Sequence, residues 1–349
     1  MLDVWTYLKS TEKPIVMYGT GDGADKIFNV FKKYDIQVSD IFVSDEFYRE
    51  GTIFQGFNTV KFTDIEKKYE DFIVVIAFAT FRLDYINRIK KIASKYEVLV
   101  PSVSVIGDDY FSLEIAKENK ALIEKAYFLL ADDESKYVFE NLISFRITGK
   151  PEYLFNAESS REDVFKDIIK LSDNETYVDL GAYRGDTVEE FLLTVKGLYK
   201  KIFALEPDNK NYQKLCENVG TLDNVECFNM ASWSHKTNLE FSGGGGRNST
   251  LFDVTNKKDI VVAIDVDSIL KDEKVTYIKM DVEGAETETL DGLQKTLKIF
   301  KPKLAVSAYH KTLDLFTLPI KIHSINPEYK IFLRHHPYIP DWESNYYCF

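Results

Sequence analysis

The chain has 349 residues, of which 45% are hydrophobic and 29% are charged, and its formal net charge is −12 at pH 7. These proportions are typical of a globular protein, and the acidic balance excludes a general nucleic-acid binder, because phosphate recognition needs clustered Lys and Arg. No apolar run is long enough for a membrane span, and the three cysteines are dispersed without a metal or disulfide motif, so we expect a cytoplasmic protein.

Residues 1–107 show the alternation of strands and helices that is typical of a small parallel α/β unit. Strands are predicted near 14–18, 37–43, 72–77 and 98–101. The turn Gly19-x-Gly21-x-Gly23 follows the first strand, and Asp45 follows the second. This pattern resembles the small nucleotide-binding-like domain at the start of some sugar-modifying enzymes. A nucleotide-sugar or NAD site and a scaffold without a ligand both remain open.

Residues 108–172 form a helical connector in this interpretation. The segment is rich in Leu, Ile, Phe and Tyr and poor in Ser and Gly. A flexible linker has the opposite composition, so we expect the connector to pack against both of its neighbours.

Residues 173–349 are predicted to form a second, larger Rossmann-like α/β domain. Its strands are expected near 177–180, 201–206, 225–229, 275–280 and 303–307, with a final antiparallel pair near 329–333 and 346–349. The fold class is therefore α/β, with a smaller unit preceding a larger one.

The turn Asp179-x-Gly181-x-x-x-Gly185 is the most informative motif of the chain. It follows a short buried strand, and a helix is predicted to begin near Asp186, which would cap it. Its spacing differs from the G-x-G-x-x-G that approaches a pyrophosphate, and it suits a small zwitterion and a ribose. The next strand ends in Glu206, roughly 20 residues later, where an acid reaches ribose hydroxyls. Together the two features predict S-adenosylmethionine as the cofactor.

In an open parallel sheet, ligands lie at the carboxyl ends of the strands. This rule also selects Asn229, Met230 and Ala231, then Asp281, and finally His310. A purely structural alternative remains for these residues. In it, Gly181 and Gly185 only make a tight turn, and Glu206 caps the helix that begins at Pro207-Asp208.

The string Ile278-Lys279-Met280-Asp281-Val282-Glu283-Gly284-Ala285-Glu286 is the second strong motif. Its carboxylates could cap a helix, but acids beside a cationic sulfonium would also orient a nucleophile or remove its proton. Together with Asp179-x-Gly181-x-x-x-Gly185, Glu206-Pro207 and Ala308-Tyr309-His310, it resembles the FkbM family of S-adenosylmethionine-dependent methyltransferases, over roughly residues 130 to 349.

The resemblance implies a class I methyltransferase fold and O-methylation, often of sugar hydroxyls in glycans or natural products. It implies that Glu206 holds the ribose and that Asn229, Met230 and Ala231 lie by the adenine. The residues expected around the methionine part and the methyl group are Asp179, Gly181, Ala182, Tyr183, Gly185, Asp186 and Asp281.

His310 is our predicted general base, because an imidazole titrates near neutrality. Asp281 and Glu283 are the competing bases. Some related O-methyltransferases hold a divalent cation with carboxylates, and Asp281 and Glu283 could contribute to such a site. The sequence offers no convincing third ligand, so no metal site is assigned and metal dependence stays open.

A run of four glycines precedes Arg247, Asn248 and Ser249. Such a loop is expensive to order, so we interpret it as a lid whose polar residues contact the acceptor, with a disordered hairpin tip as the alternative.

The sequence therefore predicts an O-methyltransferase that acts on a hydroxyl group. The expected acceptor is a sugar, a nucleotide-sugar or a glycan precursor of a surface polysaccharide or natural product. A homo-oligomer is left open. Two alternatives are a catalytically inactive nucleotide-sugar-binding protein and an NAD-dependent sugar oxidoreductase. The latter ranks last because the first unit lacks a Tyr-x-x-x-Lys motif.

Overall fold

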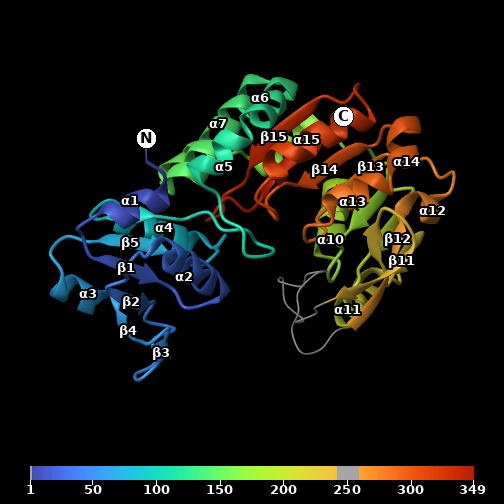
Figure 1. Cartoon of the computed structure of the whole chain (residues 1–349). Coiled ribbons are helices and arrows are strands. Elements are labelled where there is room, and N and C mark those ends of the chain that lie inside the picture. The colour runs from blue at the N-terminus through green and yellow to red at the C-terminus, as the bar shows by residue number, and fades with distance from the viewer. Residues whose placement is uncertain (1, 242–258) are drawn as a thin grey trace.

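The molecule contains two large β-sheets, one from each half of the chain, and each belongs to an α/β unit (Figure 1). The computed structural model describes residues 2–241 and 259–349. Within these residues, no helix is both long and apolar enough to cross a membrane.

The N-terminal sheet has six strands in the order β3-β4-β2-β1-β5-β6, and every pair is parallel except β3 with β4. Its strands are β1 (Ile15–Tyr18), β2 (Asp40–Val43), β3 (Ile53–Phe54), β4 (Phe57–Lys61), β5 (Ile73–Ile76) and β6 (Glu97–Leu99). Its helices are α1 (Val4–Ser10), α2 (Asp22–Tyr34), α3 (Phe62–Lys68) and α4 (Leu83–Ala93). The four predicted strands are confirmed, whereas the β3–β4 hairpin was missed. Both of its strands are short and largely solvent-accessible, so they lack a clear apolar pattern.

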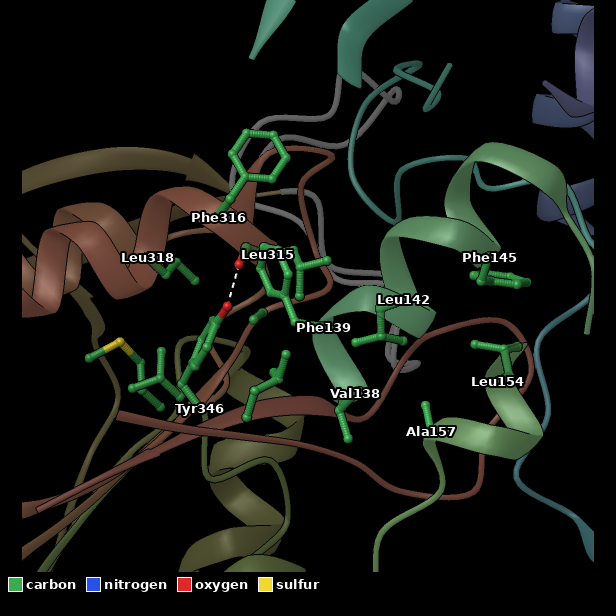
Figure 2. Close-up of a cluster of buried hydrophobic side chains, with 14 of the residues drawn as sticks. Val138, Phe139, Leu142, Phe145, Leu154, Ala157, Leu315, Phe316, Leu318 and Tyr346 are labelled. Atoms are coloured by element: carbon green, nitrogen blue, oxygen red, sulfur yellow. Dashed lines mark hydrogen bonds between the residues drawn. The ribbon is translucent and has the colours of Figure 1, made fainter. Parts of the chain in front are cut away.

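The connector is helical, as predicted. It contains α5 (Leu113–Glu118), α6 (Lys120–Leu129), α7 (Asp133–Thr148), α8 (Glu152–Ala157), α9 (Arg161–Asp163) and the π-helix η1 (Val164–Ile169). Figure 2 shows apolar side chains of α7 and α8, among them Leu142 and Leu154, in one cluster with Leu315, Phe316 and Tyr346 of the C-terminal part. The Tyr346 hydroxyl donates a hydrogen bond to the carbonyl of Leu315.

The C-terminal sheet has seven strands in the order β15-β16-β14-β13-β7-β8-β9. Its strands are β7 (Thr176–Leu180), β8 (Lys201–Leu205), β9 (Val225–Phe228), β13 (Tyr277–Met280), β14 (Lys303–Ser307), β15 (Ile331–His335) and β16 (Ser344–Cys348). The pairs from β9 to β14 are parallel, and β16 is antiparallel to both β14 and β15. The predicted final antiparallel pair is thereby confirmed.

Helices cover this sheet, which explains why its central strands read as almost continuous apolar runs. They are α10 (Asp186–Thr194), α11 (Asn209–Val219), α12 (Val266–Leu270), α13 (Glu286–Asp291), α14 (Gln294–Ile299) and α15 (Asp314–Ile325). A small third sheet pairs β12 (Asp259–Asp265) with β10 (Ala231–Trp233) and β11 (Thr237–Phe241).

One hydrophobic cluster runs through both halves of the molecule. It contains Val74 of the N-terminal sheet, Phe145 of the connector and Ile278 of the C-terminal sheet, all of them buried. The two sheets are therefore joined by packed side chains. The domain boundaries at 107/108 and 172/173 remain predictions.

Candidate active site

The carboxyl ends of strands from both sheets line one cavity of about 850 Å³. From the C-terminal sheet come the ends of β7, β8, β13 and β14, represented by Gly181, Glu206, Asp281 and His310. From the N-terminal sheet come the segments after β1, β5 and β6. Because ligands of open parallel sheets bind at this edge, the cavity is the candidate active site.

Gly181 lets β7 turn directly against the backbone of the β13 end. Its φ is +81°, and a Cβ atom there would lie 1.9 Å from the carbonyl oxygen of Asp281, so only glycine fits. Gly185 is the N-cap of α10 at φ +92°, and no side chain caps this helix. The prediction that Asp186 caps it is wrong. Asp186 is its first residue and lines the cavity instead.

Asp179 lies fully buried at the end of β7. Its Oδ2 accepts a hydrogen bond from the Thr187 hydroxyl at 2.5 Å, whereas its Oδ1 has no hydrogen-bond partner among the described residues. The nearest cation is Lys279, whose Nζ is 3.9 Å from Oδ1. Burial raises the pKa of the Asp179 carboxyl, against the opposing effect of Lys279. A buried acceptor atom without a donor is suited to a ligand's ammonium group.

Glu206 follows β8 and lines the cavity. Its Oε2 accepts from the backbone N–H of Tyr183 at 2.9 Å, and its Oε1 accepts from that of Asp208 at 2.8 Å. Burial raises the pKa of Glu206 to about 8. The helix-cap alternative is wrong, because the side chain of Asp208 caps α11.

The remaining residues predicted for the cofactor divide into two groups. Tyr183, Asp186 and Ala231 line the cavity, whereas Ala182 is fully buried beneath it. The Asn229 amide donates to the carbonyls of Glu206 and Pro207 at 2.9 and 3.0 Å, which holds the end of β8 in place. Asp179, Asn229, Met230, Ala182 and Gly185 do not line the cavity wall, so direct contact of these five with a cofactor remains a prediction.

His310 follows β14 and is surrounded by carboxylates. Its Nδ1 lies 2.8 Å from Oε1 of Glu286. Its Nε2 lies 3.3 Å from Oδ1 of Asp281 and 3.5 Å from Oε2 of Glu283. The Tyr309 hydroxyl donates to the same Asp281 oxygen at 3.1 Å. The three acids come from one short segment, in which Glu283 and Gly284 adopt φ +50° and +87° and so bring the carboxylates round a single imidazole.

The charges in this cluster separate the roles of its members. Burial lowers the pKa of His310, but Glu286, Glu283 and Asp281 outweigh it and raise the pKa to about 10. Burial raises the pKa of Glu283 to about 7, in spite of His310. Burial likewise acts to raise the pKa of Asp281, but Lys279 and His310 hold it below its ordinary value. At neutral pH the cluster thus holds an imidazolium, an ionised Asp281 and a Glu283 near its titration midpoint.

Possible metal ligands exist in this cluster, although the sequence offered no third one. Asp281, Glu286 and His310 each present an atom within 4.8 Å of the others. However, Oε1 of Glu286 already accepts from the His310 ring and from the backbone N–H of Val282 at 3.1 Å. The three groups therefore form a hydrogen-bonded ion cluster, and we assign no metal to it.

Sequence reasoning missed Glu286 as a partner of His310, Tyr309 as a partner of Asp281, and the wall that the N-terminal sheet contributes. Glu286 and Tyr309 both belong to the motifs described above, so the sequence placed them near the site. It did not show which way their side chains point. Arg247, Asn248 and Ser249 lie outside the described residues.

Comparison with known proteins supports a methyltransferase fold. Residues 179–340 match the model of the methyltransferase FkbM domain. The crystal structure of an FkbM methyltransferase from Methylobacillus flagellatus KT has a TM-score of 0.73 with this chain at 23% identity, over 99% of this chain and 92% of that one. The fold is thus the predicted class I methyltransferase fold, and the similarity in fold includes the N-terminal sheet.

Other solved structures are similar over about half of the chain. A precorrin-6y C5,15-methyltransferase from Geobacter metallireducens GS-15 is 14% identical, over 52% of this chain and 81% of that one, with a TM-score of 0.32. A putative methyltransferase from Streptococcus mutans in complex with SAH is also 14% identical, over 54% and 96%, with a TM-score of 0.33. A comparison with curated proteins gave no match.

Proposed function

We propose that this chain, in which residues 179–340 form an FkbM methyltransferase domain, is an S-adenosylmethionine-dependent O-methyltransferase that acts on a hydroxyl of a sugar or glycan precursor. The observation that carries the proposal is the combination, at one sheet edge, of an acceptor atom without a donor on Asp179 and a carboxyl with a pKa of about 7 on Glu283. The first suits a cationic donor molecule, and the second suits removal of a proton at neutral pH.

The donor would be held at the ends of β7 and β8. Oδ1 of Asp179 would receive the ammonium group, which would supply its missing hydrogen bond. Gly181, whose missing Cβ lets the ends of β7 and β13 approach each other, would contribute its backbone to the wall beside the donor. The lone pairs of Glu206 that do not face Tyr183 and Asp208 would accept from ribose hydroxyls. When bound, S-adenosylmethionine supplies the methyl group on a sulfonium centre.

Glu283 is the proposed general base, ahead of His310 and Asp281. An imidazolium with a pKa of about 10 has no free lone pair for a proton at neutral pH, and Asp281 is too weak a base because its pKa is lowered. Glu283 has a pKa near the working pH and lines the cavity, which is the best compromise for proton transfer.

His310 would act as a fixed positive charge. Its Nε2 faces Asp281 and Glu283, so it stabilises the ionised form of Glu283 that accepts the hydroxyl proton. Glu286 holds the other face of the ring at 2.8 Å and so fixes its orientation. Glu283 would take the proton of the acceptor hydroxyl, and the fixed geometry of the site would lower the entropic cost of bringing that hydroxyl to the donor.

Calorimetry with S-adenosylhomocysteine tests the proposal most directly. Wild type should bind, and Gly181→Trp should abolish binding because the side chain would fill the turn. Since that variant could misfold, Glu206→Ala is the second test. It should weaken binding about tenfold by removing two hydrogen bonds to the ribose hydroxyls, each worth about 0.5–1.5 kcal/mol. Wild-type protein that fails to bind S-adenosylhomocysteine contradicts the proposed function.

A further inference from the structure

Part of the cavity wall belongs to the segments that follow strands of the N-terminal sheet and to the loop between β15 and β16. Lining residues from the N-terminal part include Phe78 and Phe81 after β5 and Ser104 after β6. The β15–β16 loop adds Tyr338 and Trp342. Nothing in the chemistry of the donor accounts for this second wall.

Backbone contacts fix the two parts of this wall together. Thr80 and Ile339 exchange hydrogen bonds, with N···O distances of 2.7 Å from Thr80 to Ile339 and 2.9 Å in the reverse direction. On the other side, the backbone N–H of Ile106 donates to the carbonyl oxygen of His310 at 3.2 Å. The Ser104 hydroxyl lies between two carbonyl acceptors, at 2.5 Å from that of Ile106 and 3.1 Å from that of His310. The N-terminal sheet is thereby bonded directly to the catalytic loop after β14.

A row of aromatic side chains crosses this wall and ends at the proposed catalytic cluster. The ring centroids of Phe81 and Tyr338 are 6.0 Å apart, those of Tyr338 and Trp342 are 5.7 Å apart, and those of Trp342 and Tyr309 are 6.5 Å apart. Tyr309 is the residue whose hydroxyl donates to Asp281. Phe81 is 53% exposed although it stands in the wall of a cavity, so its ring is accessible to a ligand.

The charges of the cavity are unfavourable to an anion. Its described lining has seven carboxyl groups, of which Glu206, Glu283 and Glu343 have raised pKa values. The same lining contains three Lys and Arg side chains and His310, and each of these four already has partners. Arg161 pairs with Glu190 at 3.0 Å, and Lys26 donates to the carbonyls of Ser104 and Val105 at 3.2 and 2.7 Å. Lys279 lies 3.5 Å from Asp281. A diphosphate entering this part of the cavity would meet no unpaired cation among the lining residues that the structure describes.

We infer that the aromatic row from Phe81 to Tyr309 is the acceptor subsite, and that its occupant is an uncharged or cationic ring-bearing glycoside without a phosphate group. The N-terminal unit is then one wall of the active site. This inference rests on the proposed function and narrows its acceptor, because it excludes a nucleotide-sugar. Aromatic faces supply contact area to a sugar ring, while the acids nearby tolerate hydroxyl and ammonium groups.

The test uses the intrinsic fluorescence of Trp342 in the full chain saturated with S-adenosylhomocysteine. The probes are neutral methyl glycosides of hexoses and 6-deoxyhexoses, methyl glycosides of hexosamines, and UDP-glucose. We expect a saturable change with a neutral or amino glycoside that disappears in Trp342→Phe, and no change with UDP-glucose.

Two variants should weaken that binding about tenfold, the equivalent of 1.4 kcal/mol, by removing one ring each: Phe81→Ala and Tyr338→Ala. Phe47→Ala is the matched control, because Phe47 is 63% exposed on the same N-terminal unit and does not line the cavity. It should stay within twofold of wild type. All three variants should keep the wild-type affinity for S-adenosylhomocysteine.

The outcomes separate this inference from the proposed function. Binding of UDP-glucose in preference to the simple glycosides overturns the inference, as does full glycoside affinity in Phe81→Ala and Tyr338→Ala. The inference is also overturned if protein saturated with S-adenosylhomocysteine shows no fluorescence change with any of the probes. Each of these results leaves methyl transfer intact, whereas failure of the wild type to bind S-adenosylhomocysteine removes the proposed function first.

Discussion

Both sheets carry a glycine-containing turn after a buried strand, but the individual glycines differ in how closely they are packed. At Gly19, directly after β1, φ is +114° and an added Cβ would lie 3.0 Å from the Phe78 ring. At Gly181 an added Cβ would lie 1.9 Å from the carbonyl oxygen of Asp281, and φ is +81°. At Gly21, the N-cap of α2, an added Cβ would meet nothing within 4 Å, and φ is −89°. Similar glycine spacing in the sequence thus conceals two different physical situations.

The polar groups beside the two turns differ in the same way. The C-terminal edge carries buried Asp179, Glu206 and His310, whose pKa values are raised by burial or by neighbouring carboxylates. The N-terminal edge carries exposed Asp22 beside its turn, and Lys26 is bonded to carbonyls. Perturbed, buried ionisable groups cluster at functional sites, so the comparison places chemistry at one edge and a wall at the other.

The largest expected effect comes from exchanging the same side chain at the two turns. Gly181→Ala should destabilise the protein by about 2–6 kcal/mol and abolish donor binding, because it adds a clash with backbone to a left-handed conformation. Gly21→Ala should change stability by no more than about 0.5 kcal/mol. Thermal unfolding and calorimetry with S-adenosylhomocysteine measure both. Equal behaviour of the two variants would erase the distinction drawn here.

The next effect is on turnover. Glu283→Gln should lower kcat by about 10²–10⁴ while donor affinity stays unchanged, because the amide cannot take the hydroxyl proton. In wild type, kcat/KM should fall about tenfold per pH unit below pH 7, where Glu283 with its pKa of about 7 becomes protonated. The variant should lack that acid limb. A wild-type profile that is flat from pH 5 to 8 excludes Glu283 as the base.

His310→Ala distinguishes the two roles considered for the imidazole. His310 lowers the pKa of Glu283, so its removal should cut turnover and move the acid limb to higher pH. Donor affinity should remain nearly intact, since His310 contacts the carboxylates of the cluster. Were His310 itself the base, the limb would vanish. Full turnover in the variant would refute both roles. The measurement is the pH dependence of kcat/KM, with the same substrate as for Glu283→Gln.

A third effect concerns stability and pH at the end of β8. The folded state raises the pKa of Glu206 to about 8 from an ordinary 4.5, so the folded protein retains a proton that the unfolded chain releases. This contribution is fully present below about pH 4.5 and is lost as the pH rises through 8, by on the order of a few kcal/mol. Glu206→Gln cannot ionise and should not lose it. The Tm of Glu206→Gln minus the Tm of wild type should therefore increase from pH 5 to pH 8.5. The same difference for the exposed Glu217→Gln should not change with pH.

The sequence was most informative where a buried strand ends abruptly. The apolar runs before Gly181, Glu206 and Asp281 made these strand ends recognisable, and a parallel sheet brings its strand ends to one edge. The final antiparallel pair, β15 and β16, was also recognisable from apolar runs in the sequence. Elements without an alternating or continuous apolar pattern escaped, as the β3–β4 hairpin did.

The site was less predictable wherever a side-chain direction or a long-range contact decides it. The capping role assigned to Asp186 failed because Gly185 occupies the N-cap position in a left-handed conformation, which makes Asp186 the first residue of the helix. Glu286 contacts His310 because the chain turns at Glu283 and Gly284, where φ is positive. The amino-acid sequence does not reveal these backbone angles. The aromatic row joins Phe81 to Tyr338, and Ser104 reaches His310, 206 residues away in the chain. Such pairs become neighbours only through the packing of two sheets.

The smallest expected effect tests whether the wall and the catalytic edge act as one unit. Ser104→Ala removes the hydroxyl that lies 2.5 Å from the Ile106 carbonyl and 3.1 Å from the His310 carbonyl, but leaves the hydrogen bond from the Ile106 N–H to His310 at 3.2 Å. We expect a loss of about 1 kcal/mol in stability and a two- to tenfold loss in turnover, because the carbonyl keeps one donor while the loop after β14 is less restrained. Ser94→Ala is the control, since its exposed hydroxyl bonds only to the nearby Lys91 carbonyl and should change neither quantity appreciably. Chemical denaturation and steady-state rates give both numbers. If Ser104→Ala loses stability but turns over as fast as Ser94→Ala, the N-terminal sheet supports the fold without tuning the catalytic loop, and its role is confined to the wall.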